Sequence, residues 1–254
     1  VVDMQDSFVE LSSRFPDKLV LDVKEHTEEF MWPILVSIAL IAGGIHFGKK
    51  ARVPSLMDKV IAYWYLWNGV WIHLFLDVGI GYFKRVPSLT ASYALLDKRY
   101  DVMDSTVQTA IFVELFLQAP GCLCLCYGFF TRKQWRHPLQ IFVCSLHLST
   151  TIFYAMTEVV EGMPSIPVDW NLEFSIEHII YFWIYFVAAT AMWICVPLFL
   201  AGYSMRILSR QVAKLEEVTL QDNIDEQNSD GESIIVTDSV LNPKERAQER
   251  KKVK

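Results

Sequence analysis

Five long apolar stretches constrain this 254-residue chain more than any other feature. At about 1.5 Å per residue in a helix, each is long enough to cross the roughly 30 Å hydrocarbon core of a bilayer. Over such a length in lipid, only a helix satisfies its own backbone hydrogen bonds. The sequence therefore predicts an all-α integral membrane protein, a bundle of five transmembrane helices with a disordered C-terminal tail. The five stretches are residues 30–48, 60–83, 107–130, 138–158 and 179–205.

Basic residues beside these stretches predict the orientation of the chain. Lys and Arg follow the first, third and fifth stretches, whereas the loop 159–178 contains neither. Because loops rich in Lys and Arg stay in the cytosol, this pattern predicts an N-terminus outside and a cytosolic C-terminus. Four basic residues in the loop after the second stretch favour the opposite orientation.

The two ends of the chain are polar. Residues 1–29 form a mixed polar lead-in, and residues 215–254 form an acidic tail without aromatic residues, a composition typical of disorder. The net charge of −6 comes mainly from these ends, so it gives no indication of a nucleic-acid partner.

The chain ends in KKVK, with Lys251 and Lys252 at the fourth and third positions from its end. This spacing resembles the dilysine retrieval signal of endoplasmic reticulum membrane proteins, which is read in the cytosol. It predicts a multi-pass protein of that membrane with a cytosolic C-terminus. The alternative is a basic chain end that carries no address.

The five cysteines lie inside the predicted spans, three of them in the run CLCLC (122–126). They show no CxxC spacing, and no His lies near them at a spacing typical of metal ligands, so we interpret them as packing residues. The sequence also contains no glycine-rich phosphate loop, nucleophile elbow or HExxH motif. We therefore predict neither a metal nor another cofactor.

Polar side chains inside the spans are the candidates for function, because a charge near the bilayer centre costs about 2.5–3.5 kcal/mol. His73 and Asp77 are four residues apart and share one helix face, as do Glu114 and Gln118. Spacings of three and four align a polar stripe on the fourth span, which consists of His147, Thr151, Tyr154 and Glu158. The fifth span carries the polar and aromatic residues Tyr185, Thr190 and Trp193.

Such groups can be structural, since His73 and Asp77 could form a hydrogen-bonded pair that fixes helix packing. Alternatively, a His, two acids and a Trp that converge in a dry cavity form an acid/base site. A neutral acid there can protonate an alkene, and an aromatic face stabilises the resulting cation by about 2 kcal/mol. The predicted catalytic residues are His73, Asp77, Glu114 and Trp193. The predicted substrate-binding residues are Gln118, His147, Thr151, Tyr154, Glu158, Tyr185 and Thr190.

Several motifs in a fixed order resemble the emopamil-binding protein family, whose shared module is the EXPERA domain. They are WIHLFLDVG (71–79), KRYDVMDSTV (98–107), FVELFLQAPG (112–121), HPLQIFVCSL (137–146), YAMTE (154–158) and YFWIYFVAATAMWICVP (181–197). The similarity predicts an EXPERA-like four-helix membrane domain at 60–204, after a first helix and loop at 30–59. It implies isomerisation of the sterol Δ8 double bond to Δ7 through protonation, a tertiary carbocation and proton loss.

The match is incomplete at the implied active site. The family's polar residues fall on His73, Glu114, Glu158 and Trp193. Elsewhere Asp77 stands where the family has Glu, Leu117 where it has Thr, and Thr190 where it has Asn, while residues 149–151 replace Tyr-Gly-Asp. Shortening Glu to Asp withdraws the carboxyl group by one methylene, which matters where reacting atoms must lie within about 1 Å of their productive positions.

Three hypotheses therefore stay open. The first is a sterol Δ8-Δ7 isomerase, in which Glu114 or Asp77 donates the proton, His73 relays or removes one and Trp193 faces the cation. The second is a proton-initiated cyclase of a terpenoid or meroterpenoid, which the altered lining favours. The third is a non-catalytic sterol or amine binder. The expected partners are an apolar sterol or terpenoid substrate and membrane lipid, and the resemblance also allows a homodimer.

Overall fold

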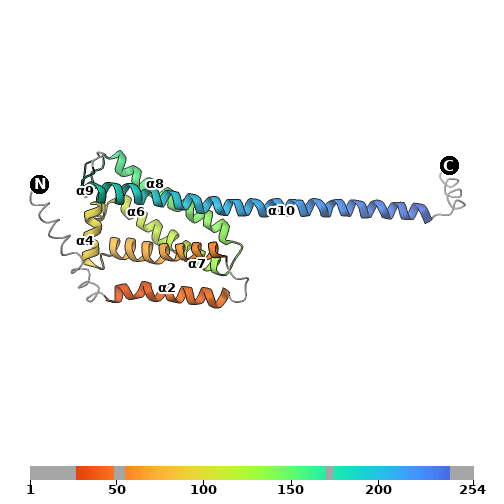
Figure 1. Ribbon diagram of the computed structural model, residues 1–254, viewed down its shortest axis with the longest axis horizontal. Helices are drawn as coiled ribbons and strands as arrows, with labels where there is room; N and C mark the ends of the chain where they lie inside the picture. Colours follow the sequence, from red (N-terminus) through yellow and green to blue (C-terminus); the bar gives the residue numbers. More distant parts are fainter. Residues whose placement is uncertain (1–26, 49–54, 170–173, 241–254) are drawn as a thin grey trace, which may run out of the picture. The chain divides into compact units, whose positions relative to one another are not determined.

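The computed structural model describes residues 27–48, 55–169 and 174–240, and every regular element in these residues is a helix (Figure 1). The segments labelled η are π-helical, with backbone hydrogen bonds that span five residues in place of four. The predicted all-α class is confirmed for these residues. The elements are α2 (Thr27–Gly48), α3 (Leu56–Leu66), η1 (Trp67–Tyr82), α4 (Pro87–Leu96), α5 (Arg99–Val102), α6 (Ser105–Val113), η2 (Glu114–Gln118), α7 (Ala119–Phe130), α8 (Arg136–Val160), α9 (Ile176–His178), η3 (Ile179–Ala188) and α10 (Ala189–Val240).

Among the described residues, three helical stretches are long and apolar enough to cross a membrane. They are Ser105–Phe130, Arg136–Val160 and Ile176–Glu226. These contain the last three of the five predicted spans. The first predicted span falls on α2, whose apolar part, Phe30–Gly43, is shorter. The second falls on α3 and η1, where Asn68, His73 and Asp77 lower the mean hydropathy. The count of five spans therefore stays a prediction.

Two helix starts are fixed by the side chains that precede them. The Ser55 hydroxyl accepts a hydrogen bond from the Asp58 amide at 3.0 Å, and the Asp58 carboxylate accepts one from the Ser55 amide at 3.3 Å. This reciprocal capping box begins α3. At the start of α6, the Asp104 carboxylate accepts a hydrogen bond from the Thr106 amide at 2.7 Å. These caps set where the helices that carry the site residues begin.

Small residues let the helices of the bundle pack closely. A Cβ atom placed on Gly69 of η1 would lie 3.0 Å from Cys122 Cβ of α7, and one on Gly121 would lie 2.6 Å from Val143 Cγ2 of α8. Neither position has room for a larger side chain unless its neighbour moves. Close approach at small residues is a general way in which membrane helices associate. The glycines therefore hold η1, α7 and α8 near one another.

Gly121→Ala is expected to lower the free energy of unfolding by about 1–3 kcal/mol, the usual penalty for overpacking a close contact. Gly43→Ala in α2 is the matched control, because a Cβ atom there would meet no atom within 4 Å. Thermal unfolding of the two variants in the same detergent measures the difference. Equal stability of the two would show that the contact between Gly121 and Val143 is not tight.

The C-terminal unit, Met205–Lys254, corrects one sequence prediction. Disorder is predicted from residue 215, but helix α10 continues to Val240. The physical reason is local. Strong helix formers follow Lys214, and no Gly or Pro occurs from there to Asp230. The Gln221 side-chain amide also donates a hydrogen bond of 2.9 Å to the Asp225 carboxylate one turn later. The remaining tail with its dilysine motif, and most of the N-terminal lead-in, lie outside the described residues.

Candidate active site

A cavity of about 280 Å³ lies within the bundle, lined by residues of η1, α4, α5, α6, η2, α8, η3 and α10. All three π-helical segments contribute to it, and π-helical turns inside α-helices frequently occur at functional sites. The cavity brings together all but one of the residues predicted as catalytic or substrate-binding. Those that line it are His73, Asp77, Glu114, Gln118, His147, Thr151, Tyr154, Tyr185, Thr190 and Trp193.

The acid/base groups lie close together on η1 and η2. His73 Nδ1 lies 3.5 Å from Asp77 Oδ2, one turn later on the same helix. A carboxylate oxygen of Glu114, the first residue of η2, lies within 4.8 Å of both groups. Within the described part of the chain, the Glu114 carboxyl group makes no hydrogen bond, whereas Asp77 accepts one from the Tyr93 hydroxyl at 3.4 Å. Glu114 is therefore the acid that is free to meet a ligand.

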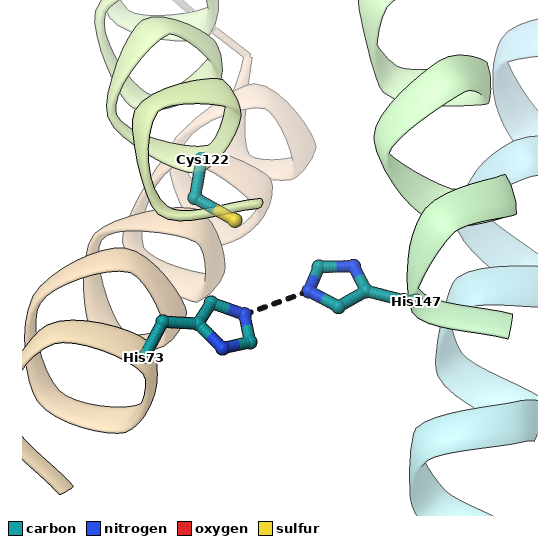
Figure 2. Close-up of side chains that lie close together, drawn as sticks. All are labelled: His73, Cys122 and His147. Carbon is teal, nitrogen blue, oxygen red and sulfur yellow. Dashed lines mark hydrogen bonds between the residues drawn. The ribbon is translucent and has the colours of Figure 1, made fainter. Parts of the chain in front are cut away.

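A second histidine completes this cluster from the opposite side. His147 of α8 faces His73 across the bundle, and their Nε2 atoms lie 2.8 Å apart (Figure 2). A hydrogen bond of this length needs a proton on one Nε2 and a lone pair on the other, so the tautomers of the two rings are coupled. The sequence predicts His147 as a substrate contact, and this direct pairing with His73 is a finding of the structure.

Trp193 covers the two imidazoles. Its ring centroid lies 6.4 Å from that of His73 and 6.1 Å from that of His147. It also stacks on Trp67, with centroids 6.1 Å apart and planes only 2° from parallel. The ring centroid of Trp64 lies 5.9 Å from that of Trp193. The Trp193 side chain is thus held in one orientation beside the cavity.

Tyrosines form another wall of the cavity. Tyr154 and Tyr185 are predicted from the sequence, whereas Tyr93 of α4 and Tyr100 of α5 are not, because they lie outside the predicted spans. Tyr154 donates a hydrogen bond to Asp97, and its hydroxyl lies 3.3 Å from that of Tyr185. This wall is therefore polar at the hydroxyls and apolar on the ring faces.

Gln118 and the threonines supply the remaining polar groups. The Gln118 side-chain amide donates to Thr150 Oγ1 at 2.8 Å, which joins η2 to α8. Thr150 also lines the cavity, although only its neighbour Thr151 is predicted from the sequence. Thr190 lines it one turn before Trp193. The position of Thr150 could have been predicted, because this residue follows His147 by three residues and therefore lies on nearly the same face of α8.

Glu158 does not reach the cavity, so the prediction that it contacts substrate does not fit its position. It is fully buried at the end of α8, and its Oε1 accepts hydrogen bonds from the amides of Ser165 at 2.7 Å and Ile166 at 3.2 Å. Its other oxygen lies 3.4 Å from Arg99 Nε. These contacts tie the turn after α8 to α5, which is a structural role.

Arg99 links that turn to the tyrosine wall. Its guanidinium lies 2.6 Å from Asp97 Oδ2 and 4.0 Å from the ring centroid of Tyr154. Burial alone would lower the pKa of Arg99, but the hydrogen bonds to Asp97 and the charges of Asp97 and Glu158 raise it above its ordinary value. The group is a permanent cation among buried acids. Its contact with the ring of Tyr154 helps to fix the position of that side chain.

Cys122 is nearer to histidine than the sequence suggests. No His is close to it along the chain, yet the fold brings its sulfur within 4.8 Å of one ring nitrogen of His73 and one of His147. The interpretation of the cysteines as packing residues is thus incomplete for Cys122. Cys144 fits it better, since its sulfur lies 3.3 Å from the Tyr65 hydroxyl inside the core of the bundle.

Comparison with known proteins places these residues in a family context. A family model described as EBP, EXPERA (EXPanded EBP superfamily), matches residues 87–204. The chain is similar to 3-beta-hydroxysteroid-Delta(8),Delta(7)-isomerase of Mus musculus, at 24% identity over 202 residues, 74% of this chain and 84% of the relative. It is similar to the rat protein of that name (Rattus norvegicus), at 21% over 232 residues, 86% and 97% of the two chains.

A third relative comes from Oryza sativa subsp. japonica and is named "Probable 3-beta-hydroxysteroid-Delta(8),Delta(7)-isomerase". It is 25% identical over 174 residues, which cover 64% of this chain and 73% of the relative. The matched region contains the helices from α4 to the part of α10 that lines the cavity. Over residues 87–204 the chain is similar to the EBP family, whose EXPERA model matches that region.

Proposed function

We propose that this protein is a membrane-embedded sterol Δ8-Δ7 isomerase that needs no cofactor. One observation carries the proposal: His73, Asp77, Glu114 and Trp193 line a single cavity. The names of the three relatives supply the substrate class, and the apolar helices that enclose the cavity fit a substrate that dissolves in lipid.

In this proposal Glu114 donates the proton. An acid in an apolar surrounding favours its neutral form, because burial of an unpaired charge is costly. The proton adds to C9 of the sterol, the positive charge develops on C8, and loss of a proton from C7 forms the Δ7 bond. Trp193 lies beside the reacting region with its orientation fixed, so its ring face can stabilise the cation.

His73 accepts the departing proton, and its neighbours prepare it for that role. Asp77 lies 3.5 Å from Nδ1 and stabilises the imidazolium that forms. In this mechanism the Nε2–H of His73 donates to Nε2 of His147, which holds the ring in place and leaves the Nδ1 lone pair to accept the proton. The proton returns to Glu114 through this cluster or through solvent between turnovers, so the site gains and loses one proton per cycle. His147 is thus a positioning residue in this mechanism.

His147→Ala is expected to lower kcat about tenfold with little change in KM, the rate equivalent of one lost hydrogen bond worth about 1.4 kcal/mol. His147→Gln should recover part of that loss, because a carboxamide can still pair with His73 Nε2. Steady-state kinetics of both variants measure the effect. Equal losses in the two variants, or a change in KM alone, would remove His147 from the positioning role.

The proposal extends to the membrane arrangement. We propose that α2 and the pair α3 and η1 also cross the membrane, which gives five spans, that the protein resides in the endoplasmic reticulum, and that its C-terminus is cytosolic. The basic residues after the first, third and fifth predicted spans support this orientation. Protease protection of N- and C-terminal epitope tags in sealed microsomes tests it.

An incubation of the purified protein in detergent tests the function. One sample receives a Δ8 sterol and a separate sample receives a farnesylated aromatic epoxide. The proposal expects a product of unchanged mass with a Δ7 double bond from the sterol and no reaction of the epoxide. A cyclised product from the epoxide would favour the cyclase. Tight binding of a cationic amine without turnover of either compound would favour a binding protein.

A further inference from the structure

Three buried side chains with metal-binding atoms converge at one edge of the cavity. His73 comes from η1, Cys122 from α7 and His147 from α8, and one ligand atom of each lies within 4.8 Å of the other two. Figure 2 shows the two imidazoles facing each other and the sulfur of Cys122 turned toward them from the neighbouring helix. Imidazole and thiolate are the ligands that zinc prefers in proteins.

We propose that His73, His147 and Cys122 bind one zinc ion, which replaces the hydrogen bond between the two imidazoles. Three protein ligands leave the fourth position of a tetrahedral ion open. That position faces the cavity, because His73 and His147 both line it.

The distances allow such an ion after small side-chain movements. With Zn–N bonds of about 2.0–2.1 Å and a Zn–S bond of about 2.3 Å, tetrahedral ligand atoms lie roughly 3.3–3.6 Å apart. The Nε2 atoms of His73 and His147, now 2.8 Å apart, must separate by about half an ångström. The Cys122 sulfur lies within 4.8 Å of one nitrogen of each ring, so it must approach them by at most about 1.3 Å.

Asp77 supplies independent support. Metal-binding histidines usually donate their second ring N–H to a carboxylate, which orients the ring and leaves the other nitrogen free for the ion. His73 Nδ1 is buried with no hydrogen-bond partner among the described residues, and Asp77 Oδ2 lies 3.5 Å from it. With a proton on Nδ1 beside Asp77, His73 would present the lone pair of Nε2 toward His147.

Zinc bound here would inhibit the enzyme, an expectation that rests on the proposed function. Coordination through Nε2 places the ring proton of His73 on Nδ1, so no lone pair is left to accept the departing proton. Binding releases the thiol proton of Cys122, whereas each imidazole keeps one proton, on Nδ1. Zinc affinity is therefore expected to rise with pH.

Cobalt titration of the purified full-length protein in detergent, without substrate, tests the site directly. One equivalent of Co²⁺ is expected to give the near-ultraviolet charge-transfer band of a thiolate-bound ion, and Zn²⁺ is expected to remove it. Cys122→Ala should lose this band. Cys126→Ala is the matched control, because Cys126 is also buried, one turn further along α7, and should keep it. No band in the wild type, or a band that persists in Cys122→Ala, would overturn the proposal.

Two further measurements separate this site from the proposed function. Asp77→Asn should weaken cobalt binding about 10- to 100-fold, as loss of an outer carboxylate does at other metal sites. In turnover assays, Cys122→Ala should need at least about tenfold more zinc for half-inhibition than Cys126→Ala. If no sterol is turned over, the cobalt band still reports the site. If turnover occurs without the band, only the metal proposal fails.

Discussion

Glu114→Gln is expected to lower turnover of a Δ8 sterol by about 10²- to 10⁴-fold, the usual contribution of a general acid. The amide has nearly the shape of the acid but carries no proton that it can give to an alkene. Because the Glu114 carboxyl group makes no hydrogen bond with the described residues, the substitution removes the proton without breaking a contact. The fold and the binding of a sterol or cationic amine should therefore be retained.

Glu161→Gln is the matched control, since this exposed residue lies beyond the end of α8 and outside the cavity. Its turnover should equal that of the wild type. Single-turnover rates and thermal unfolding in the same detergent separate loss of chemistry from loss of fold. A Glu114→Gln variant that turns over normally would exclude Glu114 as the proton donor and shift that role to Asp77.

Arg99→Met is expected to lower the free energy of unfolding by about 3–5 kcal/mol, because it leaves buried acids without their cation. Asp97 and Glu158 are both fully buried, and Arg99 lies within 3.4 Å of each. Arg99→Lys should recover only part of the loss, since a single ammonium cannot reproduce the paired hydrogen bonds that the guanidinium donates to Asp97.

Lys98→Met tests whether any loss of positive charge in this turn has the same effect. Lys98 is exposed, so its substitution should change stability by no more than about 0.5 kcal/mol. Thermal unfolding, together with the yield of monodisperse protein after detergent extraction, measures all three variants. If Arg99→Met unfolds at the same temperature as Lys98→Met, the buried charge network contributes little to the fold.

The sequence predicts the helical class and most of the cavity because both follow from short-range spacing. Polar residues three or four apart on an apolar helix share a face, and the lowest-energy place for that face is away from lipid. His73, Asp77, Glu114 and Gln118 are all found on the cavity for this reason. Trp193 and Thr190 follow the same rule on α10.

The errors arise where spacing along one helix says nothing about contacts between helices. Glu158 continues the polar stripe of α8, but the chain turns after Val160 and encloses it with Arg99, so it serves the turn and not the cavity. Cys122 and His147 are far apart in the sequence and meet only because α7 and α8 pack on η1. Tyr93 and Tyr100 come from connecting helices that hydropathy does not single out.

The most direct test of the proposed mechanism is a single turnover of a Δ8 sterol in D₂O with the protein in excess. Protonation of the alkene by an acid that exchanges with solvent predicts a Δ7 product carrying one deuterium, located at C9. Glu114→Gln should form almost none of this product in the same time. A Δ7 product free of deuterium would show that the hydrogen moves within the substrate, and would contradict proton donation by the protein.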